Sequence, residues 1–149
     1  MKVSEIMSVG VQSVRPGTPL ATARARMRAK KIHHLLVMEE AEIRGVLSVR
    51  DLTPRGRVGS APKLTVAEAM STRVVTVAPE TSVRRASNMM RGHSIGCVIV
   101  VDAGVPVGIV TLADMMALVA EPRRHRRHAP PDLHFLVPHR KQHRSGLAW

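Results

Sequence analysis

Two pairs of side chains, each a hydroxyl and a carboxylate, occur at the same spacing in two places of the sequence. Ser48 precedes Asp51 by three residues, and Thr111 precedes Asp114 by the same interval. This pattern just before a helix is that of a capping box, which stabilises a helix by about 0.5 to 2 kcal/mol. The same groups could instead hydrogen-bond to a polar ligand. Repetition of the pattern fits both interpretations, because a cap would be duplicated as well.

No catalytic arrangement accompanies these pairs. The sequence has no phosphate-binding P-loop, no H-E-x-x-H zinc motif and no further set of paired carboxylates. Its one cysteine, Cys97, lies in an apolar segment, where we expect a packed thiol and not a nucleophile. One cysteine also permits no internal disulfide and no zinc site built from thiolates. We therefore interpret the chain as a binding module, not an enzyme, with no metal site.

The chain is strongly basic and almost free of aromatic side chains. Its 149 residues include 23 Lys and Arg against 11 Asp and Glu, a formal net charge of +12, which favours anionic partners. Phe135 and Trp149 are the two aromatic residues. Residues 1–120 therefore lack the aromatic platforms that hold bases in RNA-recognition motifs and most single-strand binders. Any ligand bound there is expected to lie against aliphatic side chains.

Residues 121–149 differ in composition from the rest of the chain. They are rich in Arg, His and Pro and show no helical or alternating apolar period, which predicts a disordered basic tail. Such a tail either binds the phosphates of nucleic acid or another polyanion, or is only a solvated segment. The longest apolar stretch is too short to span a bilayer, and no signal-like segment begins the chain. These features predict a cytoplasmic protein with no membrane contact.

The sequence contains an internal repeat. Residues 3–52 align with residues 66–115 without a gap. Identical pairs include Glu5/Glu68, Met7/Met70, Pro16/Pro79, Gly45/Gly108 and Asp51/Asp114. We therefore predict a first repeat over 1–56, a linker rich in Pro, Gly and Arg over 57–63, a second repeat over 64–120 and the tail over 121–149.

Each repeat predicts the order α-β-α-β-β-α, and hence an α/β fold. The predicted segments are short helices at 4–7 and 66–70, strands at 11–15 and 74–78, helices capped by Thr18 and Thr81, strand pairs at 34–38 with 43–48 and 97–101 with 105–111, and final helices after Ser48 and Thr111. Pro19 is expected at the first helical position after Thr18.

The central helix of each repeat is predicted to be amphipathic and to cover a small sheet. Leu20, Ala23 and Met27 are spaced by three and four residues and so share one helical face. The second repeat has Val83, Ala86 and Met90 at the equivalent positions. Basic residues occupy other faces of the first helix. We expect the apolar faces to pack on the sheets and the basic residues to remain in solvent.

The repeated pattern resembles the cystathionine-β-synthase (CBS) domain, which usually occurs as a tandem pair. The resemblance covers roughly residues 1–118. It rests on the Met-Ser segments at 7–8 and 70–71, on the V-x-P turns at 14–16 and 77–79, and on GVLSVRD (45–51) and GIVTLAD (108–114). It implies two units packed as a pseudo-twofold pair, each with a three-stranded sheet flanked by helices.

The resemblance also implies a site for adenosine-containing ligands at each G-h-h-[S/T]-x-x-D motif. Asp51 and Asp114 would accept hydrogen bonds from ribose hydroxyls, and Ser48 and Thr111 would meet a phosphate. This is chemically reasonable, because a carboxylate can accept both hydrogen bonds of a vicinal diol and helix N-terminal amides favour phosphate. Gly45 and Gly108 would let a strand backbone approach closely.

Further candidate residues lie beside these motifs. Arg15 and Arg50 of the first repeat align with Ala78 and Ala113 of the second, so the first site should prefer more phosphate charge, unless both arginines are solvated surface charges. Ile32 and Ile95 would contact adenine if they are not simply core residues. His93, with His33 and His34, lies near where the family often meets phosphate, although such histidines more often have a structural role.

We therefore expect a non-enzymatic regulatory module without an obligatory cofactor. AMP, ADP, ATP or S-adenosylmethionine would bind in the cleft between the repeats, and the module would signal to a separate effector protein. The resemblance implies a homodimer for such free-standing pairs. The alternative is a dimerising scaffold that binds nucleic acid or another polyanion through its basic tail.

Overall fold

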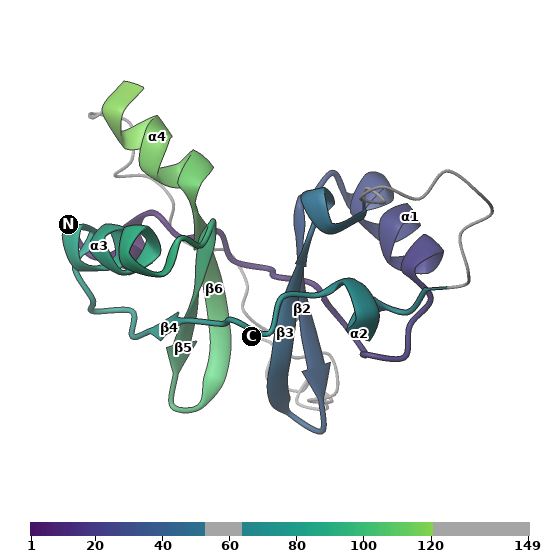
Figure 1. Cartoon of the computed structure of the whole chain (residues 1–149). Coiled ribbons are helices and arrows are strands. Elements are labelled where there is room, and N and C mark those ends of the chain that lie inside the picture. Colours follow the sequence, from purple (N-terminus) through teal and green to yellow (C-terminus); the bar gives the residue numbers. More distant parts are fainter. Residues whose placement is uncertain (53–63, 121–149) are drawn as a thin grey trace, which may run out of the picture. The chain divides into compact units, whose positions relative to one another are not determined.

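The computed structural model of the chain describes residues 1–52 and 64–120. The predicted linker and the predicted disordered basic tail lie outside these residues. The described chain forms two compact units, one of residues 12–52 with 64–74 and the other of residues 1–11 with 75–120. Each unit has its own three-stranded sheet and its own hydrophobic core (Figure 1). We name them by their strands, the β1–β3 unit and the β4–β6 unit.

The β1–β3 unit contains most of the first repeat. Its elements are β1 (Ser13–Val14), α1 (Leu20–Lys30), β2 (His34–Glu39), β3 (Glu42–Ser48), the 3-10 helix η2 (Val49–Leu52) and α2 (Val66–Ala69). Strand β2 is central, parallel to β1 and antiparallel to β3. The register places His34 opposite Ser48, so the first residue of β2 lies beside the end of β3, where the Ser48–Asp51 motif begins.

The β4–β6 unit repeats this plan. Its elements are the 3-10 helix η1 (Val3–Glu5), β4 (Thr76–Val77), α3 (Val83–His93), β5 (Cys97–Asp102), β6 (Val105–Thr111) and α4 (Leu112–Ala120). Strand β5 is central, parallel to β4 and antiparallel to β6, and Cys97 lies opposite Thr111. The predicted α/β fold and the order of elements are thus confirmed, and the four long strands match their predicted bounds to within one residue.

The first strand of each sheet is shorter than predicted. The predicted strands covered five residues each, whereas β1 and β4 have two. Pro16 and Pro79 follow closely after them. Because proline has no N–H and restricts the residue before it, the ladder cannot extend further in that direction. The parallel edge strand is therefore reduced to a brief pairing with the centre of β2 or β5.

The predicted caps of α1 and α3 are wrong by one residue. The N-cap of α1 is Pro19 and not Thr18, and the N-cap of α3 is Ser82 and not Thr81. Pro19 has an extended backbone, and its carbonyl accepts hydrogen bonds from the amides of Thr22 and Ala23. In α3, the Ser82 hydroxyl accepts a hydrogen bond from the amide of Arg85 at 3.2 Å. Proline fits the N-cap position because its fixed φ suits an extended residue there.

The apolar helix faces pack as predicted. In the β1–β3 unit, Ala23 and Met27 are buried on the sheet and Leu20 packs at the edge of the same core. In the β4–β6 unit, Ala86 and Met90 are buried and Val83 packs beside them. Burial of such side chains contributes about 1.5 to 3 kcal/mol for each large one. These contacts fix each helix against its sheet and thereby position the loop that leads into the central strand.

The two repeats exchange their N-terminal segments. The short helix η1 comes from the first repeat, but its Val3 is fully buried in the core of the β4–β6 unit. The equivalent Val66 of α2, from the second repeat, is fully buried in the core of the β1–β3 unit. The structural units therefore differ from the repeats into which the sequence divides.

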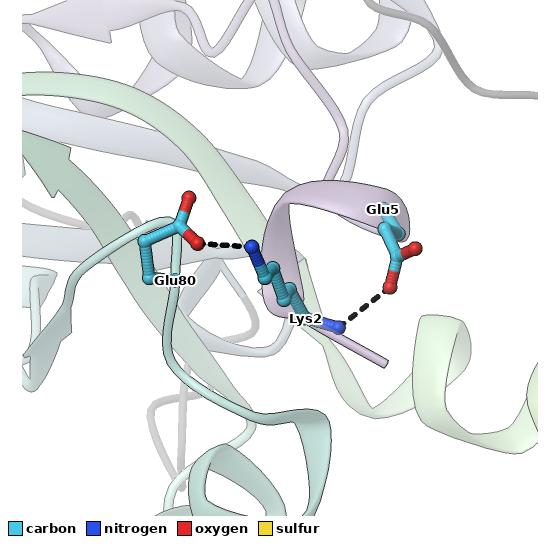
Figure 2. A network of polar contacts seen from close by, with 3 residues as sticks. All are labelled: Lys2, Glu5 and Glu80. Atoms are coloured by element: carbon cyan, nitrogen blue, oxygen red, sulfur yellow. Dashed lines mark hydrogen bonds and ion pairs between the residues drawn. The ribbon is translucent and has the colours of Figure 1, made fainter.

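A polar network holds the exchanged N-terminal segment in the β4–β6 unit (Figure 2). The Lys2 ammonium forms an ion pair with Glu80, which precedes α3, and the Lys2 amide donates to the Glu5 carboxylate at 2.6 Å. The hydrogen bond and charge of Glu80 raise the pKa of Lys2 above its usual value. Both side chains of the ion pair are exposed, so this contact orients the segment while the burial of Val3 stabilises it.

The hairpins of the two sheets turn through equivalent residues of different type. The β2–β3 turn uses Glu40 and Ala41 at φ 49° and 69°, and the β5–β6 turn uses Ala103 and Gly104 at φ 47° and 79°. Two positive φ values in a two-residue loop are the mark of a type I′ turn, whose second position favours glycine. Ala41 therefore carries backbone strain that Gly104 avoids.

Ala41→Gly is expected to stabilise the β1–β3 unit by about 0.5 to 1 kcal/mol, because relief of the left-handed strain outweighs the entropy of the added glycine. Chemical denaturation of the full chain measures this. The matched change Gly104→Ala should destabilise the β4–β6 unit by a similar amount. A loss of stability in Ala41→Gly would contradict the assignment of strain.

None of the helices in the described part of the chain combines the length and the apolar character needed to cross a bilayer.

Candidate functional site

Each Ser/Thr–Asp pair closes into a hydrogen-bonded box at the end of a strand. The Asp51 Oδ2 accepts hydrogen bonds from the Ser48 amide at 2.7 Å and from the Ser48 hydroxyl at 3.0 Å. In the other unit, the Asp114 Oδ2 accepts from the Thr111 amide at 2.7 Å and from the Thr111 hydroxyl at 2.9 Å. The Asp114 amide also donates to the Thr111 hydroxyl at 3.3 Å, so this motif is a complete capping box, whereas the Ser48–Asp51 motif forms the carboxylate half of one.

The box leaves half of each carboxylate available. One oxygen, Oδ2, takes both hydrogen bonds in each motif, and within the described residues no hydrogen bond is formed by Oδ1 of Asp51 or Asp114. Both side chains are half-buried. A carboxylate held rigidly by one oxygen presents the other at a fixed position, where it can accept hydrogen bonds from a ligand. A cap and a ligand contact are thus compatible at the same aspartate.

The loop before each central strand is tied directly to the motif. The amide of Val49, the first residue of η2, donates to the His33 carbonyl at 3.0 Å, and the amide of Leu112, the first residue of α4, donates to the Gly96 carbonyl at 3.0 Å. These loops follow left-handed residues, Lys31 and Ser94, that end α1 and α3. The geometry therefore places the loop backbone beside the strand end from which the motif starts.

The predicted adenine contacts, Ile32 and Ile95, lie in these loops. The amide of each donates to a carbonyl of the preceding helix, that of Met27 or Met90, at 3.0 Å. Each side chain is half-buried and packs against the core of its unit. Both isoleucines thus pack partly in the core, and the rest of each side chain remains exposed in the loop beside the motif. Another candidate, His93, is the last residue of α3 and is exposed.

The two predicted arginines lie at different places of the β1–β3 unit. Arg50 belongs to η2, is exposed, and directly precedes Asp51. Arg15 follows β1, whose Val14 pairs with Val37, three residues along β2 from His34. At about 3.3 Å per residue, Arg15 lies more than about 10 Å along the sheet from the end at which Ser48 pairs. Within this unit Arg50 therefore lies directly beside the motif in sequence, whereas the backbone of Arg15 lies further along the sheet.

The glycine that opens each motif is required by the exchanged segment. The amide and carbonyl of Val46 bond to Ser71, and those of Ile109 bond to Ser8, all at 2.9 to 3.0 Å. A Cβ on Gly45 would lie 2.6 Å from the Ser71 carbonyl oxygen, and a Cβ on Gly108 would lie 2.5 Å from the Met7 sulfur. Each glycine was expected to allow another backbone to approach closely. The segment that approaches it is the Met-Ser segment of the other repeat.

The expectation that the sequence lacks catalytic motifs is wrong at one place, because residues 92–96 read G-H-S-I-G and match the G-x-S-x-G form of a nucleophile turn. That turn leads from a strand into a helix, with an exposed serine at its tip. Here Ser94 instead ends α3 and leads into β5, and its amide donates to the carbonyls of Met90 and Arg91. Ser94 is therefore a helix C-cap and not a nucleophile.

Over residues 1–52 and 64–120, no three His, Cys, Asp or Glu side chains gather closely enough to hold an ion.

Comparison with known proteins identifies the domain family of both repeats. A family model of the CBS domain matches residues 3–55 and 66–121. The CBS domain-containing protein YhcV of Bacillus subtilis is 33% identical over 117 residues, which is 76% of this chain and 81% of that protein. Proteins built from CBS pairs are generally regulatory and non-catalytic modules.

Solved structures show the same fold. The CBS domain pair of protein MJ0100, in complex with 5′-methylthioadenosine and S-adenosyl-L-methionine, has a TM-score of 0.71 and 24% identity, covering 83% of this chain and 98% of that one. The hexameric CBS-CP12 protein from bloom-forming cyanobacteria has a TM-score of 0.70 and 25% identity, covering 83% of this chain and 72% of that one. With its two matched repeats and their boxed Ser/Thr–Asp motifs, the chain belongs to the CBS domain family.

Proposed function

We propose that this chain is a non-enzymatic regulatory module that binds an adenosine-containing small molecule at its two motifs and signals its presence to a separate protein. The observation that carries the proposal is the aspartate of each motif, fixed through one oxygen with the other oxygen unused by the described residues. A fixed carboxylate oxygen is suited to accept the hydrogen bonds of a ribose diol.

Two further features support this ligand class. Ile32 and Ile95 offer partly exposed aliphatic surface beside the motifs, against which a flat apolar base could lie. The MJ0100 domain pair, which shares the fold, binds 5′-methylthioadenosine and S-adenosyl-L-methionine. Both of these molecules contain adenosine without a phosphate, so adenosine is the common element of the proposed ligand class.

The two motifs are expected to differ in their preference for phosphate. Arg50 lies beside Asp51, whereas the equivalent residue beside Asp114 is Ala113. A guanidinium adds charge-assisted hydrogen bonds to a phosphate, each contributing about 1.5 to 3 kcal/mol. The Asp51 motif should therefore favour ATP or ADP, and the Asp114 motif should accept AMP or an uncharged tail. Arg50→Ala should reduce this difference.

The test is isothermal titration of the full chain, stripped of co-purified nucleotide, with AMP, ADP, ATP and S-adenosylmethionine. We expect micromolar binding of at least one of them. The informative variant is Asp51→Asn with Asp114→Asn, because the amide oxygen can keep the box while the other acceptor becomes a donor. This variant should lose about tenfold or more in affinity.

The control variant is Asp102→Asn, which changes an exposed aspartate at the hairpin end of β5 and should bind as the natural chain does. Thermal denaturation checks that each variant folds. Absence of heat with all four molecules, or full affinity in the double Asn variant, would refute the proposed ligand contacts and leave the motifs as helix caps alone.

A further inference from the structure

Helix α1 of the β1–β3 unit carries a dense set of positive charges and no negative one. Its sequence is LATARARMRAK, and Lys31 follows as its C-cap. The cationic residues Arg24, Arg26, Arg28, Lys30 and Lys31 are all exposed. Those near the C-terminus interact favourably with the helix dipole, which explains part of the pattern. The helix dipole does not explain the presence of Arg24 and Arg26 in the middle of the helix.

No carboxylate in the described part of the unit neutralises this helix. The ion pairs found there join Arg44 to Glu39 and Glu42, at the hairpin end of the sheet. Asp51 bonds to Ser48 and Glu68 bonds to Thr65, and Glu40 lies in the β2–β3 hairpin turn. The positive potential of α1 is therefore open to an external anion.

The cations form two rows along the helix. Arg24, Arg28 and Lys31 are spaced by four and three residues on one side, and Arg26 and Lys30 are spaced by four on the other. The contacts agree with this, since Arg24 donates to the Leu52 carbonyl at the η2 side whereas Arg26 donates to the Ser13 carbonyl at the start of β1. Between the rows, the exposed outer face consists of Ala21, Thr22, Ala25 and Ala29.

This surface suits phosphate groups better than a peptide or a lipid bilayer. Guanidinium groups bind phosphate through two parallel hydrogen bonds, and a strip of alanines allows an extended backbone to approach closely. The outer face has no large apolar side chain that could anchor a peptide or insert among lipid chains. On the outer face, Thr22 is the one side chain with a hydrogen-bonding group and the three alanines have none, so recognition is expected to depend little on base sequence.

We propose that α1 binds the phosphate backbone of duplex nucleic acid, without sequence preference. This binding would need neither the ligand motifs nor the basic residues of 121–149. Helix α3, the equivalent in the other repeat, does not have the same two rows of cations, because Ser87 and Met89 stand at the positions of Arg24 and Arg26. It retains Arg84, Arg85 and Arg91, which are all exposed and provide a matched control.

The experiment measures fluorescence anisotropy of a labelled 20-base-pair duplex, as DNA and as RNA, with the full chain over a range of salt concentrations. The test variant is Arg28→Gln, Lys30→Gln and Lys31→Gln, which leaves the hydrogen-bonded Arg24 and Arg26 in place. The control variant is Arg84→Gln, Arg85→Gln and Arg91→Gln, which removes the same charge. Circular dichroism verifies the fold of both.

We expect the α1 variant to lose about tenfold to a hundredfold in affinity near 0.1 M salt and to reduce the salt slope by about two to three, while the α3 variant changes much less. Equal losses in both variants, or no loss in either, would overturn the proposal and assign binding to overall charge or to residues 121–149. It would also be overturned if the natural chain binds neither duplex, or if α1 substitution affects only binding to phosphatidylserine vesicles.

Discussion

A fragment of residues 12–74 should unfold cooperatively on heating, whereas a fragment of the same length, residues 1–63, should show no cooperative transition. The first fragment keeps the complete β1–β3 unit with α2. The second keeps the first repeat and its following segment but lacks α2, and it carries η1 without the unit in which η1 is buried. Circular dichroism and dispersion of amide resonances measure the difference.

The reason is the amount of stabilisation that residues 64–74 supply to the β1–β3 unit. Val66 is fully buried in its core, with Ala69 and Met70 packed beside it. Five backbone hydrogen bonds join this segment to the rest of the unit, at Pro16, Thr18, Leu20 and, twice, Val46. At about 1 kcal/mol for each hydrogen bond and about 2 kcal/mol for the valine, the loss is comparable with the whole stability of a small domain.

A mixing experiment gives this prediction an internal control. A synthetic peptide of residues 64–74, added to the 1–63 fragment, should restore the cooperative transition, because it supplies the missing helix. The same peptide with Val66→Asp should not, because an unpaired carboxylate would have to be buried. If the 1–63 fragment folds as stably as the 12–74 fragment, the exchanged segments contribute little and the sequence repeats are themselves the folding units.

The internal repeat made the elements of this fold predictable. The same apolar strand patterns occur in both repeats. They predicted the bounds of β2, β3, β5 and β6 to within one residue. Faces at spacings of three and four located the buried side of α1 and α3. Local signals were less exact at element ends, where Pro19 and Ser82 took the capping positions expected for their neighbours.

Contacts between distant segments were not predictable in the same way. Alignment shows that Met7 resembles Met70 and that Gly45 resembles Gly108, but similarity between copies does not reveal that Met70 contacts Gly45 and Met7 contacts Gly108. Likewise, the alignment of Arg15 with Ala78 does not reveal where β1 pairs along β2, because the parallel register of these strands is not visible in the sequence. The motif itself was predictable as a cap, and the unused oxygen of its aspartate became visible only with the geometry.

Gly45→Ala should destabilise the β1–β3 unit by about 1 to 3 kcal/mol, the range typical of overpacking. The added methyl group would lie 2.6 Å from the Ser71 carbonyl oxygen and 2.8 Å from the Met70 sulfur. Methionine can change rotamer, but the Ser71 backbone is held by two hydrogen bonds to Val46. Either these bonds lengthen or β3 bends away, and both weaken the attachment of α2. Chemical denaturation of the full chain measures the effect.

Gly17→Ala is the matched control, since its Cβ would meet nothing within 4 Å. It should leave stability unchanged or raise it by up to about 1 kcal/mol, because alanine restricts the unfolded chain. Gly108→Ala is expected to be milder than Gly45→Ala, since its closest contacts are side-chain atoms of Met7 and the Ser8 carbonyl is 3.1 Å away. The loss of stability should therefore decrease in the order Gly45, Gly108, Gly17. The reason is that the added Cβ meets a backbone oxygen first at Gly45, a movable side chain first at Gly108 and no atom at Gly17. A different order would show that the Met-Ser segments are held less firmly than their hydrogen bonds indicate.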